Sequence, residues 1–159
     1  MAEYVGTSGN DIIDQDALGL SSRTTFIGGA GDDVIRIRNG VGFGGQGNDR
    51  IEVVGDEWMP VVYADSPAGV VVDLAAGTAE DGWGTHDTLL GRIFQVNATG
   101  FGDRLYGNAA DNAFFTGSGD DFVDGREGLD AVAISRLDHY EVRVSIDGVT
   151  ATIIERVNP

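Results

Sequence analysis

Oxygen-bearing side chains recur at a fixed interval of nine residues between residues 98 and 133. The residues at this interval are Asp103, Asn112, Asp121 and Asp130. The second residue after each of them is always apolar, namely Leu105, Phe114, Val123 and Val132. Carboxylate and amide oxygens are ligands that a hard cation prefers. The spacing therefore suggests repeated cation binding rather than a single reactive centre.

A fixed period of this kind indicates a solenoid, in which each repeat stacks on its neighbour. A nine-residue unit divides into a turn of six residues and a strand of three, whose middle side chain points inward. Two units complete one circuit, so we expect Asp103 to stack on Asp121, and Asn112 on Asp130. Stacked carboxylates repel each other unless a cation lies between them. Ca²⁺ suits that gap because it takes roughly 6–8 oxygen ligands, including main-chain carbonyls.

Two fuller copies of the turn lie nearer the N-terminus. They are Gly28-Gly29-Ala30-Gly31-Asp32-Asp33-Val34-Ile35 and Gly44-Gly45-Gln46-Gly47-Asn48-Asp49-Arg50-Ile51. Both fit the calcium-binding nonapeptide Gly-Gly-x-Gly-x-Asp-x-apolar-x. Here the chain resembles the repeats-in-toxin (RTX) family, the haemolysin-type calcium-binding repeats of secreted bacterial proteins. The resemblance implies an all-β fold, a right-handed parallel β-roll or β-helix solenoid with calcium ions in its turns.

The resemblance also implies a set of calcium ligands. Side-chain ligands at the sixth turn place would be Asp33, Asp49, Asp103, Asp121 and Asp130, with Asn112 as a weaker one. Asp11 closes a turn that resembles the usual opening of such arrays, and Asp87 is a candidate for the sixth place of a degenerate turn. Carbonyl ligands at the first, third and fifth places would be Gly28, Ala30, Asp32, Gly44, Gln46, Asn48, Thr116, Ser118 and Asp120.

The chain is expected to form one solenoid domain over residues 1–159. We expect a first repeat block at 6–54, an irregular β insert at 55–97 and a second repeat block at 98–133. Within the insert, 77–85 is predicted to be a flexible acidic loop. Residues 137–155 alternate around Asp147-Gly148, a two-residue turn signal, which predicts a β-hairpin. Such a hairpin would cap the open end of the solenoid.

Composition limits the classes of partner. The chain has 159 residues with 25 glycines, 3 prolines, no cysteine and a net charge of −16. This charge disfavours nucleic acid and anionic membrane surfaces, and no apolar run approaches the ~20 residues of a membrane helix. The start of the sequence lacks the pattern of a signal peptide. The family often leaves the cell by type I secretion, so the resemblance implies an extracellular module, although an excised fragment fits equally well.

Three alternatives remain open. The turns could be structural only, since Asp and Asn favour turns for local reasons. The chain could be a polysaccharide-binding module linked to a catalytic domain, such as an alginate epimerase, with Trp58, Trp83 and Tyr106 as sugar platforms. It could also be a small β-helical hydrolase or lyase, although His86 beside Asp87 is better interpreted as a loop histidine. We expect no catalytic activity in this chain, because periodic acids suit cation binding better than acid–base work.

Overall fold

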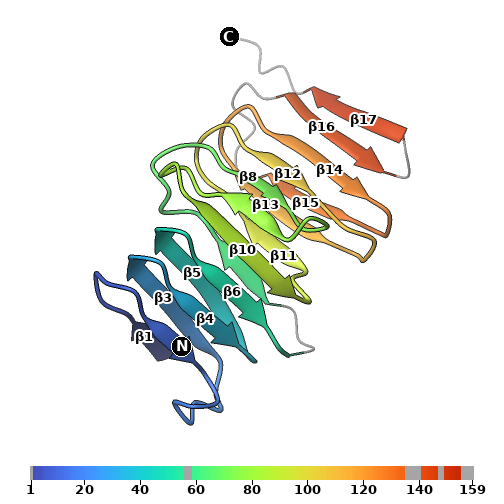
Figure 1. Ribbon diagram of the computed structural model, residues 1–159. Coiled ribbons are helices and arrows are strands. Elements are labelled where there is room, and N and C mark those ends of the chain that lie inside the picture. Colours follow the sequence, from blue (N-terminus) through green and yellow to red (C-terminus); the bar gives the residue numbers. More distant parts are fainter. Residues whose placement is uncertain (1, 56–58, 135–140, 147–148, 155–159) are drawn as a thin grey trace.

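The computed structural model describes residues 2–55, 59–134, 141–146 and 149–154. Within these ranges every regular element is a β-strand, and no helix is present. The strands form two sheets whose neighbouring members are mostly parallel, and successive rungs stack from the N-terminus to the C-terminus (Figure 1). The all-β solenoid predicted from the nine-residue period is therefore confirmed. Among the described residues, no helix is long and apolar enough to cross a membrane.

The first sheet contains seven strands, each parallel to its neighbours. In spatial order they are β1 (Ala2–Val5), β3 (Thr24–Ala30), β5 (Gly40–Gln46), β7 (Pro60–Val62), β11 (Gln95–Asn97), β13 (Ala113–Gly117) and β15 (Ala131–Ile134). The second sheet contains ten strands. In spatial order they are β2 (Ile12–Asp14), β4 (Val34–Ile37), β6 (Arg50–Val53), β10 (His86–Gly91), β9 (Thr78–Glu80), β8 (Val71–Asp73), β12 (Arg104–Tyr106), β14 (Phe122–Arg126), β16 (Glu141–Ile146) and β17 (Val149–Ile154).

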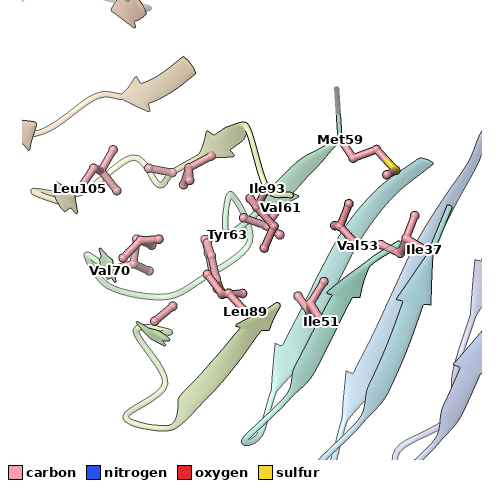
Figure 2. Packing of buried hydrophobic residues seen from close by; sticks show 14 of the residues in the cluster. Ile37, Ile51, Val53, Met59, Val61, Tyr63, Val70, Leu89, Ile93 and Leu105 are labelled. Carbon is pink, nitrogen blue, oxygen red and sulfur yellow. The ribbon is translucent and has the colours of Figure 1, made fainter. Parts of the chain in front are cut away.

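The core runs between the two sheets as stacked inward-pointing side chains. In the second sheet Ile35 lies beside Ile51, and Leu105 lies beside Val123, at equivalent places of neighbouring strands. Each of these four side chains is at most 1% exposed. Figure 2 shows part of this cluster, which includes Tyr63. The apolar eighth place of the period therefore faces inward, as strand alternation predicts, and fixes the register of the turns.

The segment between the two repeat blocks departs from the regular winding. After β7 the chain enters the second sheet at β8, next to β12, and then turns back through the antiparallel strand β9 to β10, next to β6. The prediction of a loop over 77–85 is wrong for Thr78–Glu80, which pair with strands on both sides. The residues of this short strand have no marked β-propensity of their own. They form a strand because they pair with β8 and β10, which a reading of local sequence does not reveal.

The C-terminal end of the second sheet carries an antiparallel hairpin. Strand β16 pairs in parallel with β14, and β17 pairs antiparallel with β16. The predicted capping hairpin at 137–155 is thus present in its two strands. The Asp147-Gly148 turn signal lies outside the described residues.

Candidate metal centre

Six of the predicted aspartates lie along one edge of the solenoid, and all of them except Asp87 stand where a turn from the first sheet enters the second. They form two stacks because the antiparallel strand β9 interrupts the rungs. The first stack is Asp11, Asp33, Asp49 and Asp87, and the second is Asp103 and Asp121. The eighteen-residue interval thus correctly places Asp103 on Asp121. Asp87 contacts Asp49 and not Asp103, because β10 pairs with β6.

Every aspartate of the two stacks except Asp11 accepts a hydrogen bond from the main chain of the neighbouring rung. The Oδ1 atom of Asp33 accepts the N–H of Asp11 at 2.8 Å, and the Oδ1 atom of Asp49 accepts the N–H of Asp33 at 2.8 Å. Asp87 and Asp121 accept in the same way at 3.0 Å from Asp49 and Asp103. The Oδ1 atom of each of these carboxylates therefore links two neighbouring turns, and the Oδ2 atom is available to other partners.

The second oxygens of Asp33 and Asp49 have no hydrogen-bond partner. Both side chains are 1% exposed, and both Oδ2 atoms are buried. Ionised oxygens in this condition carry a large desolvation cost unless a positive charge compensates them. This pair is the feature of the edge that best fits a cation-binding site.

The first-place glycines make room for these carboxylates. A Cβ at Gly28 would lie 2.3 Å from Oδ2 of Asp33 and 2.4 Å from the carbonyl oxygen of Gly44. A Cβ at Gly44 would lie 2.4 Å from Oδ2 of Asp49. Each carboxylate therefore folds back over the start of its own turn, and the Gly28 position brings a carboxylate oxygen close to a carbonyl oxygen of the next turn. Such a mixed donor set is what Ca²⁺ accepts.

Other aspartates of the two stacks are bonded by nearby protein groups. The N–H and hydroxyl of Thr7 donate to Oδ2 of Asp11 at 2.6 and 2.8 Å. Thr99 donates its N–H to Oδ2 of Asp103 at 2.9 Å and its hydroxyl to Oδ1 of the same residue at 2.9 Å. The hydroxyl of Tyr63 donates to Oδ2 of Asp87 at 3.0 Å. All three Oδ2 atoms thus accept hydrogen bonds from the protein, and Asp87 and Asp103 accept at Oδ1 as well.

The aspartate edge is electrostatically strained without a cation. Burial raises the pKa of Asp49 to about 6, and repulsion from Asp33 adds to this rise. Burial likewise raises the pKa of Asp87 to about 7 and that of Asp121 to about 6. The pKa values of Asp33 and Asp103 are raised by burial as well. Protonation or a bound cation would relieve this penalty.

The expected carbonyl ligands lie at the ends of neighbouring strands. Ala30 pairs with Gln46, and the carbonyl of Gln46 accepts the N–H of Gly31 at 2.8 Å. A carbonyl oxygen has two lone pairs, so this bond leaves one acceptor site. The fifth-place side chains form their own ladder, in which Oδ1 of Asp32 accepts the N–H of Asn48 at 2.8 Å.

The turn at 116–121 differs from the two fuller copies. Thr116 stands at its first place and is fully buried, and Ser118 donates its hydroxyl to the carbonyl of Gly100 at 3.3 Å. The Thr116 hydroxyl lowers the pKa of Asp121, against the larger effect of burial. The fifth-place residue Asp120 is exposed. This turn therefore lacks the first-place glycine on which the Asp33 and Asp49 arrangement depends.

The opposite edge carries Asn112 and Asp130. As predicted, they stack, with the N–H of Asn112 donating to Oδ1 of Asp130 at 2.9 Å. The N–H of Asn108 donates to Oδ1 of Asn112 at 2.9 Å. A positive side chain lies close by: Arg126 donates from Nη1 to the carbonyl of Gly107 at 2.7 Å.

Arg126 also forms a bidentate ion pair that the sequence did not reveal. Its Nη1 and Nη2 atoms lie 2.7 Å from Oδ1 and Oδ2 of Asp73, which is 53 residues away. Its guanidinium lies 5.6 Å from the ring centroid of Tyr106. Arg126 is the one non-glycine residue among those described that has a positive φ, at 63°. Arg126 stands at the second place of its turn, where the fuller turns have glycine. An arginine at this place does not indicate a positive φ, so its position could not be inferred from the sequence.

The alternative sites differ in their placement. His86 and Asp87 alternate along β10, so His86 is exposed and lies 3.8 Å from Glu80, while Asp87 is buried. Tyr106 is half-buried, with the ring of Phe122 at 5.6 Å. Trp83 is half-buried in the turn before β10, and Trp58 lies outside the described residues.

In the described part of the chain, no three Asp, Glu or His side chains converge into a ready metal site. A cation at the aspartate edge would thus need main-chain carbonyls for most of its ligands, as the turn sequence implies. The search of known protein families and of curated proteins found no match to this chain.

Proposed function

We propose that this chain is a non-catalytic calcium-binding module of the RTX type, from a secreted bacterial protein. The observation that carries the proposal is the pair of buried Oδ2 atoms on Asp33 and Asp49, which have no partner and lie in adjacent turns. Two such anionic oxygens at one edge are compensated by a cation and not by water, because both side chains are almost completely buried.

The chemistry of the donors selects Ca²⁺ among common cations. The edge offers carboxylate and carbonyl oxygens, whereas zinc sites use cysteine and histidine. The chain has no cysteine, and the side chain of His86 is exposed. Mg²⁺ demands nearly ideal octahedral geometry and keeps several waters, which suits a buried turn poorly. When bound, Ca²⁺ would supply positive charge to Asp33 and Asp49 and tie their two turns together.

Ion binding at this edge would be coupled to folding. The raised pKa values of Asp49 and Asp121 indicate that the charged, ion-free edge destabilises the fold. A net charge of −16 adds repulsion throughout the compact state. Extracellular modules bind Ca²⁺ at about 10⁻⁴–10⁻³ M, so the module would complete its folding after secretion, outside the low-calcium cytosol.

Catalysis is a weaker explanation of the same residues. A general acid must reach its substrate, but Asp87, whose pKa is raised to about 7, is 2% exposed and bonded to Tyr63. Asp49 and Asp121, whose pKa values are also raised, are buried as well. They hold the main chain of neighbouring turns, which is a structural and ion-binding role.

The proposal is tested by calorimetric titration of EDTA-stripped protein with Ca²⁺ and, separately, Mg²⁺. Asp33→Asn should weaken Ca²⁺ binding by about tenfold or more, because it removes a charged ligand while keeping the side-chain shape. Asp65→Asn, at an exposed position, is the matched control and should bind like the wild type. Absence of Ca²⁺ binding in the wild type, or equal binding of Mg²⁺, would count against the proposal.

A further inference from the structure

We propose that protein groups replace the cation at several turns, so that along the aspartate edge, from Asp11 to Asp121, the ion requirement is concentrated at residues 28–49. The proposal rests on the calcium-binding function and adds which turns use the ion. It predicts two parts with different behaviour, a cation-dependent segment at 28–53 and a cation-independent segment at 98–126. The sequence alone favours the opposite emphasis, because the strict nine-residue period lies in the second block.

The second turn place distinguishes the turns that end at Asp33 and Asp49 from the turn that ends at Asp103. In the turns that end at Asp33 and Asp49, this place holds Gly29 and Gly45, with φ of 113° and 102°. In the turn that ends at Asp103 it holds Thr99, whose N–H and hydroxyl both donate to the carboxylate. Two hydrogen bonds from one residue thus satisfy oxygens that a cation would otherwise hold.

Protein donors also contact the two aspartates that flank Asp33 and Asp49 in the stack. On one side Thr7 donates two hydrogen bonds to Asp11. On the other side the Tyr63 hydroxyl donates to Asp87, directly below Asp49 in the stack. Asp33 and Asp49 therefore lie between two carboxylates whose Oδ2 atoms already accept hydrogen bonds from the protein.

On the opposite edge, a fixed positive charge lies beside the turn at 107–112. The guanidinium of Arg126 donates to the carbonyl of Gly107, the first-place residue of the turn at 107–112. It also binds Asp73 through two hydrogen bonds of 2.7 Å. Asn112, which carries no charge, occupies the sixth place of that same turn. In the turn at 107–112, the Arg126 guanidinium and the uncharged Asn112 amide thus take the place of a metal ion and a carboxylate.

Asp49 and Asp103 provide a matched pair for the test. Both are 1% exposed, and both accept a main-chain N–H through Oδ1, from Asp33 and Val70 respectively. Calcium binding to EDTA-stripped full-length protein would be measured by calorimetry. Asp49→Asn should weaken binding by about tenfold or more, and Asp103→Asn should leave it unchanged. Equal weakening in both variants would overturn the inference while leaving the calcium function intact.

Thr99 supplies a second comparison. Thr99→Gly removes the hydroxyl and allows the backbone of the other turns, so the thermal stabilisation given by Ca²⁺ should become larger than in the wild type. Thr99→Ser keeps the hydroxyl and should behave like the wild type. A Thr99→Gly protein that loses stability equally with and without Ca²⁺ would show that Thr99 only packs, and would contradict the inference.

Hydrogen–deuterium exchange of the unmodified chain avoids any variant that fails to fold. In EDTA, the amides of β14 (Phe122–Arg126) should stay protected, while those of β4 and β6 exchange quickly until Ca²⁺ is added. Uniform exchange of all strands in EDTA, followed by uniform protection with Ca²⁺, would overturn the two-part behaviour but not calcium binding. No response to Ca²⁺ in any strand would overturn both.

Discussion

Asp33 donates its main-chain N–H to Oδ1 of Asp49 at 2.8 Å, while Oδ2 of Asp49 is buried without a partner. A single carboxylate thus connects two turns through one oxygen, and its other oxygen makes no hydrogen bond. The same relation joins Asp11 to Asp33 in the preceding turn. These hydrogen bonds from main-chain N–H groups partly offset the repulsion between aspartates that are stacked at strand spacing.

The first-place glycine should be indispensable where the carboxylate folds back. Gly28→Ala would put a methyl group 2.3 Å from Oδ2 of Asp33, and the backbone carbonyl of Gly44 leaves no route of escape. We expect a loss of about 1–3 kcal/mol in unfolding free energy and weaker Ca²⁺ binding. Gly9→Ala is the control, because the nearest atom to its Cβ lies 3.9 Å away. Urea denaturation with and without Ca²⁺ measures both, and equal stability of the two variants would contradict the geometry.

Removal of the Tyr63 hydroxyl should create a new need for a cation. Tyr63→Phe would leave Oδ2 of Asp87 buried without its hydrogen bond, at a cost of about 1–3 kcal/mol in EDTA. The shape of the core is kept, since the ring of Tyr63 remains among its apolar neighbours (Figure 2). Part of the lost stability should return on addition of Ca²⁺. Thermal unfolding with and without Ca²⁺ decides this, and a loss that Ca²⁺ does not reduce would contradict the role given to Tyr63.

The Arg126–Asp73 ion pair should stabilise the second block without calcium. Arg126→Lys would lose the bidentate geometry and the bond to Gly107, so we expect about 1–3 kcal/mol of destabilisation in EDTA. Both side chains are about one-third exposed, so solvent screening should keep the loss towards the lower end. Arg38→Lys at the more exposed Arg38–Asp16 pair is the control and should change little. A larger effect at Arg38 in denaturant titrations would contradict this ranking.

Ion-free protein should be more stable in weak acid than at neutral pH. The pKa values of Asp49 and Asp121 are raised to about 6, and that of Asp87 to about 7. A raised folded-state pKa means that the folded state binds more protons than the unfolded state. This contribution is therefore complete below the unfolded pKa of 3.8 and is lost as pH rises through about 6 to 7.

The measurement is the melting temperature in EDTA between about pH 5 and pH 8. It should fall across this range in the wild type, and Asp87→Asn should flatten the fall. Ca²⁺ should reduce the part of the fall that Asp49 contributes, because the bound ion would replace the proton on that carboxylate. A melting temperature in EDTA that rises with pH would contradict the raised pKa values.

The repeat spacing predicted the strands and much of the stacking, because solenoid contacts join equivalent places of successive turns. The intervals alone placed Asp33 beside Asp49 and Asp103 beside Asp121. They could not place Asp87, since its neighbour depends on strand β9, which pairs antiparallel and breaks the period. The chain reverses direction between β8 and β9, and this reversal depends on pairing with distant strands, which local sequence does not indicate.

The partners of the carboxylates were also hidden from the sequence. Thr99 was visible only as a departure from glycine, yet its two donated bonds change the needs of Asp103. Arg126 and Asp73 lie far apart in the chain and meet only because their strands stack around β12. A ligand list taken from the repeat alone therefore treats every turn as equal, whereas the surroundings of each aspartate differ.

The central claim, that calcium ions complete this fold, is tested most directly by far-ultraviolet circular dichroism during a Ca²⁺ titration of EDTA-stripped protein. The account predicts a gain of β signal with a midpoint at about 10⁻⁴–10⁻³ M Ca²⁺, from a starting spectrum that already contains some β-structure. An equal concentration of Mg²⁺ should produce little change. A complete β spectrum in EDTA that Ca²⁺ leaves unaltered, with no shift in melting temperature, would contradict it.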